Sequence, residues 1–178
     1  TLMGHGYDVV RGIVAKKGGV TYKYSTKEEP YINPENKRKG IGVIIGADGE
    51  NVTIGEDVFG NKYTTTTTNT YVVINGQAKV DVATSITDSA NLDGSISHVK
   101  GTTKYNYTDG TEDSSTLSPE YVKKGKVIKG LLKSASGSTE TETQDVSGNR
   151  STANTTNVYV YRKGQAFLDR ADTTTGGQ

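Results

Sequence analysis

Oxygen ligands suited to calcium gather in one short segment of the chain. Asp88, Asn91 and Asp93 fall close together in the sequence TDSANLDGS. Carboxylate and amide oxygens are the donors that Ca²⁺ prefers in proteins. The segment lacks the twelve-residue spacing of an EF-hand loop, and Asp and Asn are also common turn residues. We therefore treat these three residues as a candidate calcium site, the one cofactor that the sequence suggests.

Residues that catalysis usually needs are sparse. The chain has no cysteine, which excludes a thiol nucleophile, a disulfide framework and a cysteine-ligated metal. Its two histidines, His5 and His98, lie at positions that do not correspond to one another, and no G-x-S-x-G motif accompanies them. No phosphate-binding glycine motif lies between a strand and a helix. The sequence therefore predicts that the protein is not an enzyme, and it indicates no cofactor besides the candidate calcium ion.

The charge balance does not favour a nucleic-acid partner. Lys and Arg total 21 and Asp and Glu total 20, so the net charge is +1. Proteins that bind nucleic acids usually show a clear basic excess or a basic face. Two short basic clusters occur at positions 37–39 and 123–129. We interpret them as solvated residues of loops and edge strands.

The composition favours β-strands. Threonine occurs 26 times, glycine 22 times and tyrosine 11 times, whereas leucine occurs only six times. Threonine, valine, tyrosine and isoleucine suit a pleated, half-buried surface, and glycine with Asn or Asp suits the turns between strands. The predicted fold class is therefore all-β.

The chain contains an internal duplication. Residues 57–83 and 145–171 align at an offset of 88 without a gap, and 15 of the 27 positions are identical. The matches include the patterns Gly-Asn, Asn-x-Tyr-Val and Gly-Gln-Ala-x-x-Asp-x-Ala. A fainter similarity lies upstream, where residues 21–26 resemble residues 104–110. A repeat of this kind indicates a structural unit that is present twice.

Each copy is predicted to form an antiparallel β-meander. Tyr22 and Tyr24 alternate with polar residues, which is typical of a strand. Asn75-Gly76 predicts a tight hairpin turn after a long strand at 62–74. Thr64 to Thr68 show no alternation, so this strand is expected to carry hydroxyl groups on both faces and to form a long Thr-rich hairpin. We expect the two copies to pack as a sandwich or as consecutive sheets.

The predicted organisation has four parts. These are a lead-in at residues 1–18, a first β repeat at 19–87, a connector at 88–101 and a second β repeat at 102–175. The lead-in contains apolar residues that are candidates for a strand donated to a neighbouring sheet. These predicted assembly residues are Tyr7, Val9, Val10, Ile13 and Val14.

Two segments resemble parts of pore-forming proteins. The sequence LMGHGYDVV at residues 2–10 resembles the opening stretch of membrane-attack-complex/perforin domains, and the polar strands resemble the hairpins of aerolysin-like pore formers. That resemblance implies a toxin with a membrane as its partner. The tryptophan- and histidine-containing central motif of the first family is missing. Thr64 to Thr68 also lack the polar and apolar alternation that separates lumen from lipid. Pore formation is therefore an alternative function.

The interpretation that we prefer is a non-enzymatic structural protein that is secreted or exposed at the cell surface. Only 31% of the residues are hydrophobic, so an isolated subunit is expected to have a modest core. Self-assembly by β-strand pairing would supply further buried area. The expected product is a homo-oligomer or polymer, such as an extracellular fibre, an appendage or an adhesin stalk. A virion component, such as a phage tail, fibre or decoration protein, is a second alternative.

Overall fold

Strands make up nearly all of the regular structure in the computed structural model, which describes residues 14–32, 37–57, 59–117, 119–162 and 165–177. The strands are β1 (Val14–Tyr24), β2 (Tyr31–Ile32), β3 (Lys39–Gly40), β4 (Ile44–Glu56), β5 (Lys62–Ile74), β6 (Gln77–Ala90), β7 (Ile96–Tyr107), β8 (Val122–Lys123), β9 (Lys126–Val127), β10 (Leu132–Gln144), β11 (Arg150–Arg162) and β12 (Gln165–Gly177). A short 3₁₀ helix at Pro119–Tyr121 precedes β8. The prediction of an all-β fold is confirmed.

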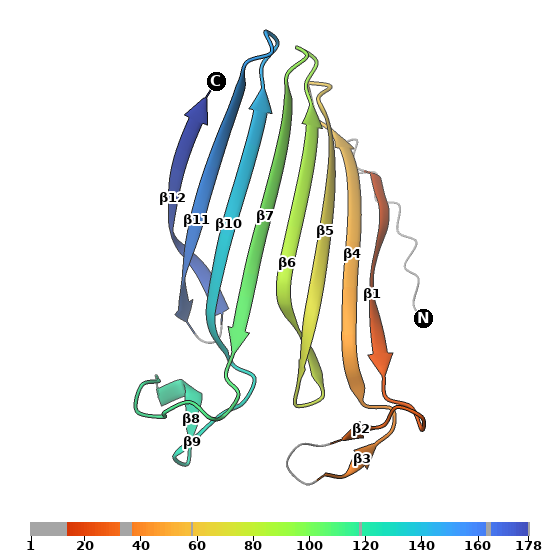
Figure 1. Cartoon of the computed structure of the whole chain (residues 1–178), viewed down its shortest axis with the longest axis vertical. Helices are drawn as coiled ribbons and strands as arrows, with labels where there is room; N and C mark the ends of the chain where they lie inside the picture. The colour runs from red at the N-terminus through yellow and green to blue at the C-terminus, as the bar shows by residue number, and fades with distance from the viewer. Residues whose placement is uncertain (1–13, 33–36, 58, 118, 163–164, 178) are drawn as a thin grey trace.

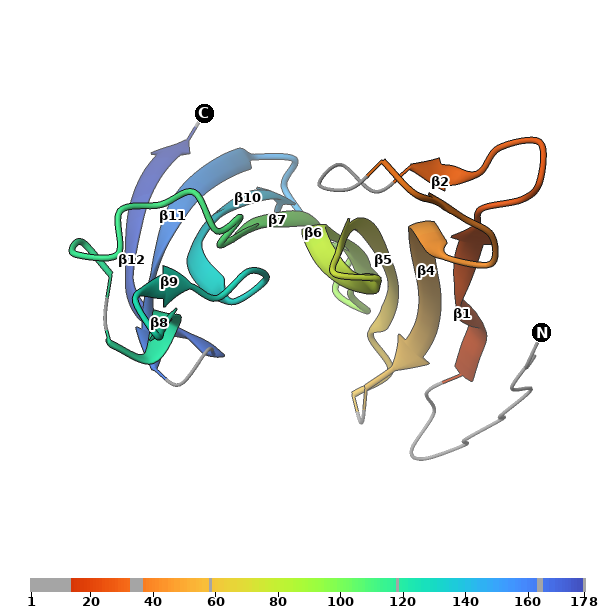
Figure 2. The same ribbon diagram turned by 90° about the horizontal axis from the view of Figure 1, so that it is seen from below.

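Eight strands form one antiparallel sheet in the order β1-β4-β5-β6-β7-β10-β11-β12 (Figure 1). Seen along the strands, this sheet is a single curved layer (Figure 2). The expected sandwich or consecutive sheets are therefore replaced by one continuous sheet. The reason is that β6, the last strand of the first copy, pairs directly with β7, the first strand of the second.

The duplication extends to the strands of the structure. Strands β4, β5 and β6 begin at residues 44, 62 and 77, and β10, β11 and β12 begin 88 residues later, at 132, 150 and 165. β1 and β7 are the first strands of the two copies. The small hairpins β2-β3 and β8-β9 follow them and lie at the same end of the sheet (Figure 1). The first copy therefore comprises β1 to β6, and the second comprises β7 to β12.

Both copies begin earlier than the sequence predicted. Residues 14–18 of the predicted lead-in belong to β1 and pair with β4 of the same chain. The predicted connector at 88–101 is itself part of the sheet, because it contains the end of β6, the turn at 91–95 and the beginning of β7. Polar and glycine-containing sequence, at Lys17-Gly18 and Lys100-Gly101, weakens the strand pattern at both places.

The Thr-rich strand β5 lies inside the sheet and does not project from it. It pairs with β4 on one side and with β6 on the other. Asn75 and Gly76 form the predicted two-residue turn, with φ angles of 53° and 74°, and Ile74 lies opposite Gln77. The long hairpin is thus present, and its threonines are part of a solvated sheet.

A buried hydroxyl group bonds the chain after β1 to the end of the small β2-β3 hairpin and to the residues that follow it. Ser25 follows β1, and its side chain donates a hydrogen bond to the Gly40 carbonyl and accepts one from the Val43 N–H, both at 3.0 Å. Only 3% of Ser25 is exposed. We call this arrangement the hydroxyl tie. It fastens the small hairpin to the sheet in place of an apolar core.

The second copy contains the same hydroxyl tie. Thr108 follows β7 and is fully buried; its hydroxyl donates to the Ile128 carbonyl and accepts from the Leu131 N–H. The Gly130 N–H donates to the Thr108 carbonyl, as the Gly42 N–H does to the Ser25 carbonyl. Gly42 and Gly130 have φ angles of 74° and 82°, in the left-handed region that favours glycine.

Matched aspartates close the hairpin turns at the opposite end of the sheet. The Asp57 carboxylate accepts hydrogen bonds from the N–H groups of Phe59 and Asn61 and from the Asn61 side-chain amide. Asp145 has the equivalent bonds in its own turn, including both contacts from Asn149. The side-chain bond from the asparagine is the largest influence that lowers each pKa. The repeated Asp-x-x-Gly-Asn pattern is thus a turn motif.

Very little of the chain is buried. Apart from glycines, the buried side chains of the described residues are Ala47, Tyr121, Ser25 and Thr108. The chain exposes 12613 Å², whereas a folded monomer of 19.0 kDa typically exposes about 8,400 Å². The sheet is therefore a single layer whose two faces are both in contact with solvent.

Candidate functional site

One face of the sheet is free of charged residues across the described register. Directly paired residues point to the same face, and alternate residues of a strand point to opposite faces. One row of paired residues crosses all eight strands: Val20, Gly49, Asn69, Ala83, Thr103, Gly137, Asn157 and Ala171. A second row lies two positions closer to the β4-β5 and β6-β7 turns. It holds Gly18, Asn51, Thr67, Ser85, Gly101, Thr139, Thr155 and Thr173. We call this surface the uncharged face.

Tyrosines lie across glycines on the uncharged face, at matched places in the two copies. The Tyr71 hydroxyl lies 3.1 Å from where a Cβ on Gly49 would be, and the Tyr159 hydroxyl lies 3.2 Å from the same point on Gly137. A larger residue at either glycine would displace the ring. The matched glycines therefore keep this part of the face flat.

The opposite surface, which we call the charged face, carries the ionisable residues of the strands. In the register these include Asp48, Glu50, Lys62, Asp88, His98, Lys100, Glu140, Glu142, Arg150, Arg170 and Asp172. This division is not evident at Thr64 to Thr68, where both faces carry threonine. The alternation of threonine and glutamate in Ser138 to Thr143 was the signal that could have found it.

An open concavity of about 1020 Å³ lies at the end of the sheet where turns join β4 to β5, β6 to β7 and β10 to β11. Its lining includes Asp88 and His98, whose Oδ1 and Nδ1 atoms are 2.6 Å apart. Both side chains are well exposed, and Glu142 lies opposite His98 on the next strand. The register thus places a carboxylate residue on each of the two strands that flank His98. This arrangement suits a cross-strand hydrogen bond on the charged face.

The three candidate calcium ligands have protein partners in the structure. Asp88 pairs with His98, and the Asn91 amide donates to the Ser95 hydroxyl at 2.8 Å. Asp93 accepts bonds from the N–H and the hydroxyl of Ser95, which lower the pKa of its carboxyl group. No group of three or more His, Asp or Glu residues suited to a metal occurs in the described part of the chain. The calcium site stays a prediction.

Most of the predicted assembly residues lie outside the described residues. This applies to Tyr7, Val9, Val10 and Ile13. Val14 is the first residue of β1, where it pairs with Ile54 of its own chain. The donated strand that we predicted from this segment stays a prediction.

The sheet has two open edges, formed by β1 and β12. Within the described residues, β1 pairs only with β4, and β12 pairs only with β11. β12 is 13 residues long and contains neither proline nor lysine. β12 has a bulge at Asp169, but its regular part at 170–177 offers a row of backbone N–H and C=O groups to another strand. Local sequence patterns do not identify these edges, because strand order depends on long-range pairing.

The matched aspartates Asp81 and Asp169 occupy β-bulges. In β6, the register shifts so that Asp81 has no direct partner on β5, and in β12 the same holds for Asp169 and β11. An extra residue of this kind bends a strand and increases its twist. Because of the bulges, the uninterrupted rows lie in the half of the sheet nearer the turns that join β4 to β5, β6 to β7 and β10 to β11.

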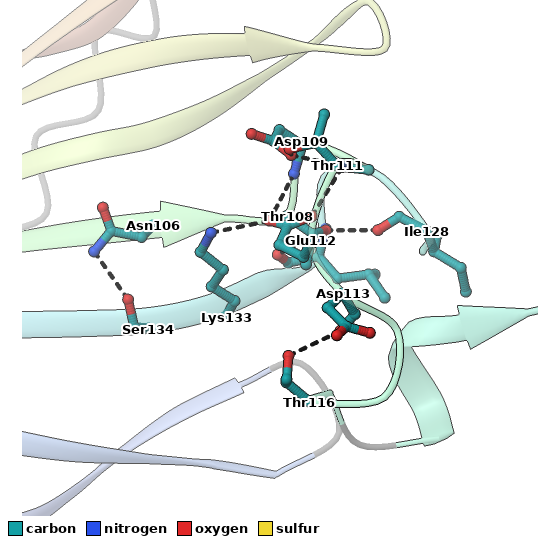
Figure 3. A network of polar contacts seen from close by, with 12 residues as sticks. Asn106, Thr108, Asp109, Thr111, Glu112, Asp113, Thr116, Ile128, Lys133 and Ser134 are labelled. Carbon is teal, nitrogen blue, oxygen red and sulfur yellow. Dashed lines mark hydrogen bonds and ion pairs between the residues drawn. The ribbon is translucent and has the colours of Figure 1, made fainter. Parts of the chain in front are cut away.

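The second copy has an additional polar network beside its hydroxyl tie (Figure 3). Lys133 Nζ lies 2.9 Å from Glu112 Oε1, and the N–H groups of Asp109 and Gly110 donate to the same carboxylate. Burial raises the pKa of Glu112, but the Lys133 ammonium and these N–H groups outweigh it and hold the pKa at about 2. The carboxylate therefore fastens the loop after β7 to β10.

Comparison of the chain with protein-family models, curated proteins and solved structures gives no match. Within the described residues, no helix is long and apolar enough to cross a membrane. The structural features that bear on function are therefore the open edges, the two faces of the sheet and the repeated hydroxyl ties.

Proposed function

We propose that this chain is a non-enzymatic structural subunit that assembles with copies of itself by pairing β-strands at the edges of its sheet. The product is a fibre, an appendage or a stalk outside the cell or on its surface. The observation that carries the proposal is the single-layer sheet with an open strand, β1 or β12, at each end.

The exposed area supports assembly. The chain exposes 12613 Å², about half as much again as the roughly 8,400 Å² typical of a folded monomer of its mass. A stable protein–protein contact usually buries about 800 Å² on each partner. The surplus is therefore large enough for contacts with more than one neighbour.

The sheet edges also support assembly through the backbone. An added strand forms main-chain hydrogen bonds and does not require a deep apolar pocket. This mode suits a chain with few apolar residues and long polar strands. The uncharged face also supports assembly. A neighbour that covers its threonine, serine and glycine residues removes no ionised group from water.

The experiment is light scattering coupled to size-exclusion chromatography across a range of protein concentrations, with negative-stain images of the largest species. We expect particles that grow with concentration and appear as filaments, ribbons or rings. A chain that stays at 19.0 kDa at every concentration would overturn the proposal. Turnover of a substrate that is lost in a His98→Ala variant would contradict its non-enzymatic part.

A further inference from the structure

We infer that β12 of one copy pairs with β1 of a second copy, antiparallel and in the register that joins β6 to β7 within the chain. The inference rests on the proposed self-assembly and specifies its geometry. The assembly is head-to-tail, because the two edges that meet are different surfaces of the molecule.

The junction between β6 and β7 is the template. In the duplicated structure, β12 corresponds to β6 and β1 corresponds to β7. Within the chain, the last strand of the first copy thus pairs with the first strand of the second copy. The last strand of the second copy has the same place in its unit but lacks such a neighbour in the described structure. The first strand of another chain supplies the missing neighbour.

Strand direction agrees with this arrangement. All neighbours in the eight-stranded sheet are antiparallel, so its first and last strands, β1 and β12, run in opposite directions (Figure 1). A second copy placed beside the first without inversion therefore brings an antiparallel β1 against β12. The alternation of strand directions continues unbroken across the contact.

The register can be read from matched rows. Ala83 lies opposite Thr103 at the internal junction. Ala171 ends the same row in the second copy, and Val20 begins it in the first. The inferred contact thus places Ala171 opposite Val20 of the second copy, as Ala83 lies opposite Thr103.

The neighbouring rows fit this register. Arg170 then faces Thr21, Asp172 faces Gly19, and Thr173 faces Gly18, so no like charges meet directly in these rows. At the internal junction, Ser85 faces Gly101, the residue that corresponds to Gly18. A slip of one residue would move Arg170 and Asp172 onto the uncharged face of the neighbouring copy.

Disulfide crosslinking tests the register, and the absence of cysteine from the chain makes every disulfide attributable to introduced residues. Because successive rows alternate between close and wide pairs, two neighbouring rows are tested. The single variants are V20C, A171C, G19C and D172C, and the internal control pairs are A83C with T103C and T84C with T102C. The row whose internal control pair forms a disulfide within one chain has the geometry for crosslinking, and the contact between chains is judged from that row.

In that row, we expect a mixture of the two single variants to form covalent dimers under oxidation as efficiently as the internal pair closes. Each single variant alone should remain uncrosslinked. If assembly is seen by light scattering but the mixture gives no dimer, or if one variant crosslinks to itself, the head-to-tail register is wrong and self-assembly stands. If wild-type chains do not associate at all, the proposed function fails.

Discussion

β1 and β7 begin the two copies of one structural unit, yet β7 is paired on both sides and β1 on one side only within the described residues. The two strands occupy the same place in their units and share Lys-Gly at the start of their matched rows. The two strands therefore differ in the number of strands that pair with them and not in their place within the unit. The internal junction between β6 and β7 is therefore the template for the pairing that we propose at the open edges.

The two copies also differ where their small hairpins join the sheet. Both have the hydroxyl tie, from Ser25 in the first copy and Thr108 in the second. Among the described residues, only the second copy has the short, half-buried Lys133–Glu112 pair, whereas the Lys23–Glu29 pair of the first is 3.8 Å long and largely exposed. The tie is thus the shared structural device, and the ion pair is an addition to one copy.

Proline in β12 should have the largest effect on self-association, because it would prevent another strand from pairing at this open edge. We would make T173P and T174P separately. Successive N–H groups of an edge strand point alternately to its neighbour and to solvent, so one variant loses only a solvent-facing N–H. That variant should keep the wild-type circular dichroism spectrum but associate about 100-fold more weakly, or about 2.7 kcal/mol.

The matched control places proline at Gly18 or Gly19 on β1, the opposite edge. Assembly should fail again, but a mixture of one β12-blocked and one β1-blocked variant should form dimers and nothing larger. Unchanged filaments from a folded, proline-containing β12 would contradict the role that we assign to this edge.

Removal of the hydroxyl tie should have the next largest effect. In T108V, the shape of the side chain is kept while the Ile128 carbonyl and the Leu131 N–H lose their partner in a buried place. We expect a loss of about 3 kcal/mol in unfolding free energy, measured by urea denaturation. T108S should restore most of it.

S25A is the corresponding change in the first copy and should cost a similar amount. Hydrogen exchange at the Val43 and Leu131 amides will show whether each loss is confined to its own copy. Equal exchange at both amides in both variants would argue against two separate ties.

Neutralising Glu112 should sharpen the difference between the copies. E112Q removes a charge-assisted network and should cost about 2 kcal/mol at pH 7. The folded pKa of about 2 lies below the ordinary 4.5. The stabilisation is therefore complete above pH 4.5 and is lost as the pH falls from 4.5 toward 2. Urea denaturation of wild type and E112Q across this range should converge at the acid end.

E29Q is the control in the first copy. Its ion pair with Lys23 is exposed, and such pairs contribute about 0–1 kcal/mol. The variant should therefore differ little from wild type at any pH. A loss in E29Q as large as that in E112Q would remove the distinction between the two loops.

The smallest difference between the copies is expected at their hairpin turns. D57A and D145A each remove a carboxylate that accepts two backbone N–H groups and one amide. Each should lower the midpoint of thermal denaturation only slightly, because the turns are exposed and water can replace the carboxylate. Thermal denaturation should give the same shift for both variants within error.

The sequence predicted the parts of the fold that depend on local signals. Asn75-Gly76 and the Asp-x-x-Gly-Asn turns set the hairpins, and the offset of 88 residues located the matched strands. The boundaries of the copies were missed, because residues 14–18 and 96–101 alternate only weakly.

The candidate contact surfaces were less accessible from sequence. The uncharged face appears only when the register places Thr139 between Gly101 and Thr155, and Thr141 between Val99 and Ala153. The hydroxyl ties are not evident from the sequence either, although residues 21–26 and 104–110 are similar. Their role depends on contacts with the Gly40 and Ile128 carbonyls, which lie well separated from Ser25 and Thr108 in sequence and meet them only in the folded chain.

Hydrogen exchange as a function of protein concentration tests the central claim most directly. At assembling concentrations, we predict that Gly18–Thr21 of β1 and Arg170–Thr174 of β12 become protected together. Their protection should approach that of the internal β6–β7 junction, which should not depend on concentration. Protection at only one of the two edges, or at neither edge in assembled protein, would contradict the account.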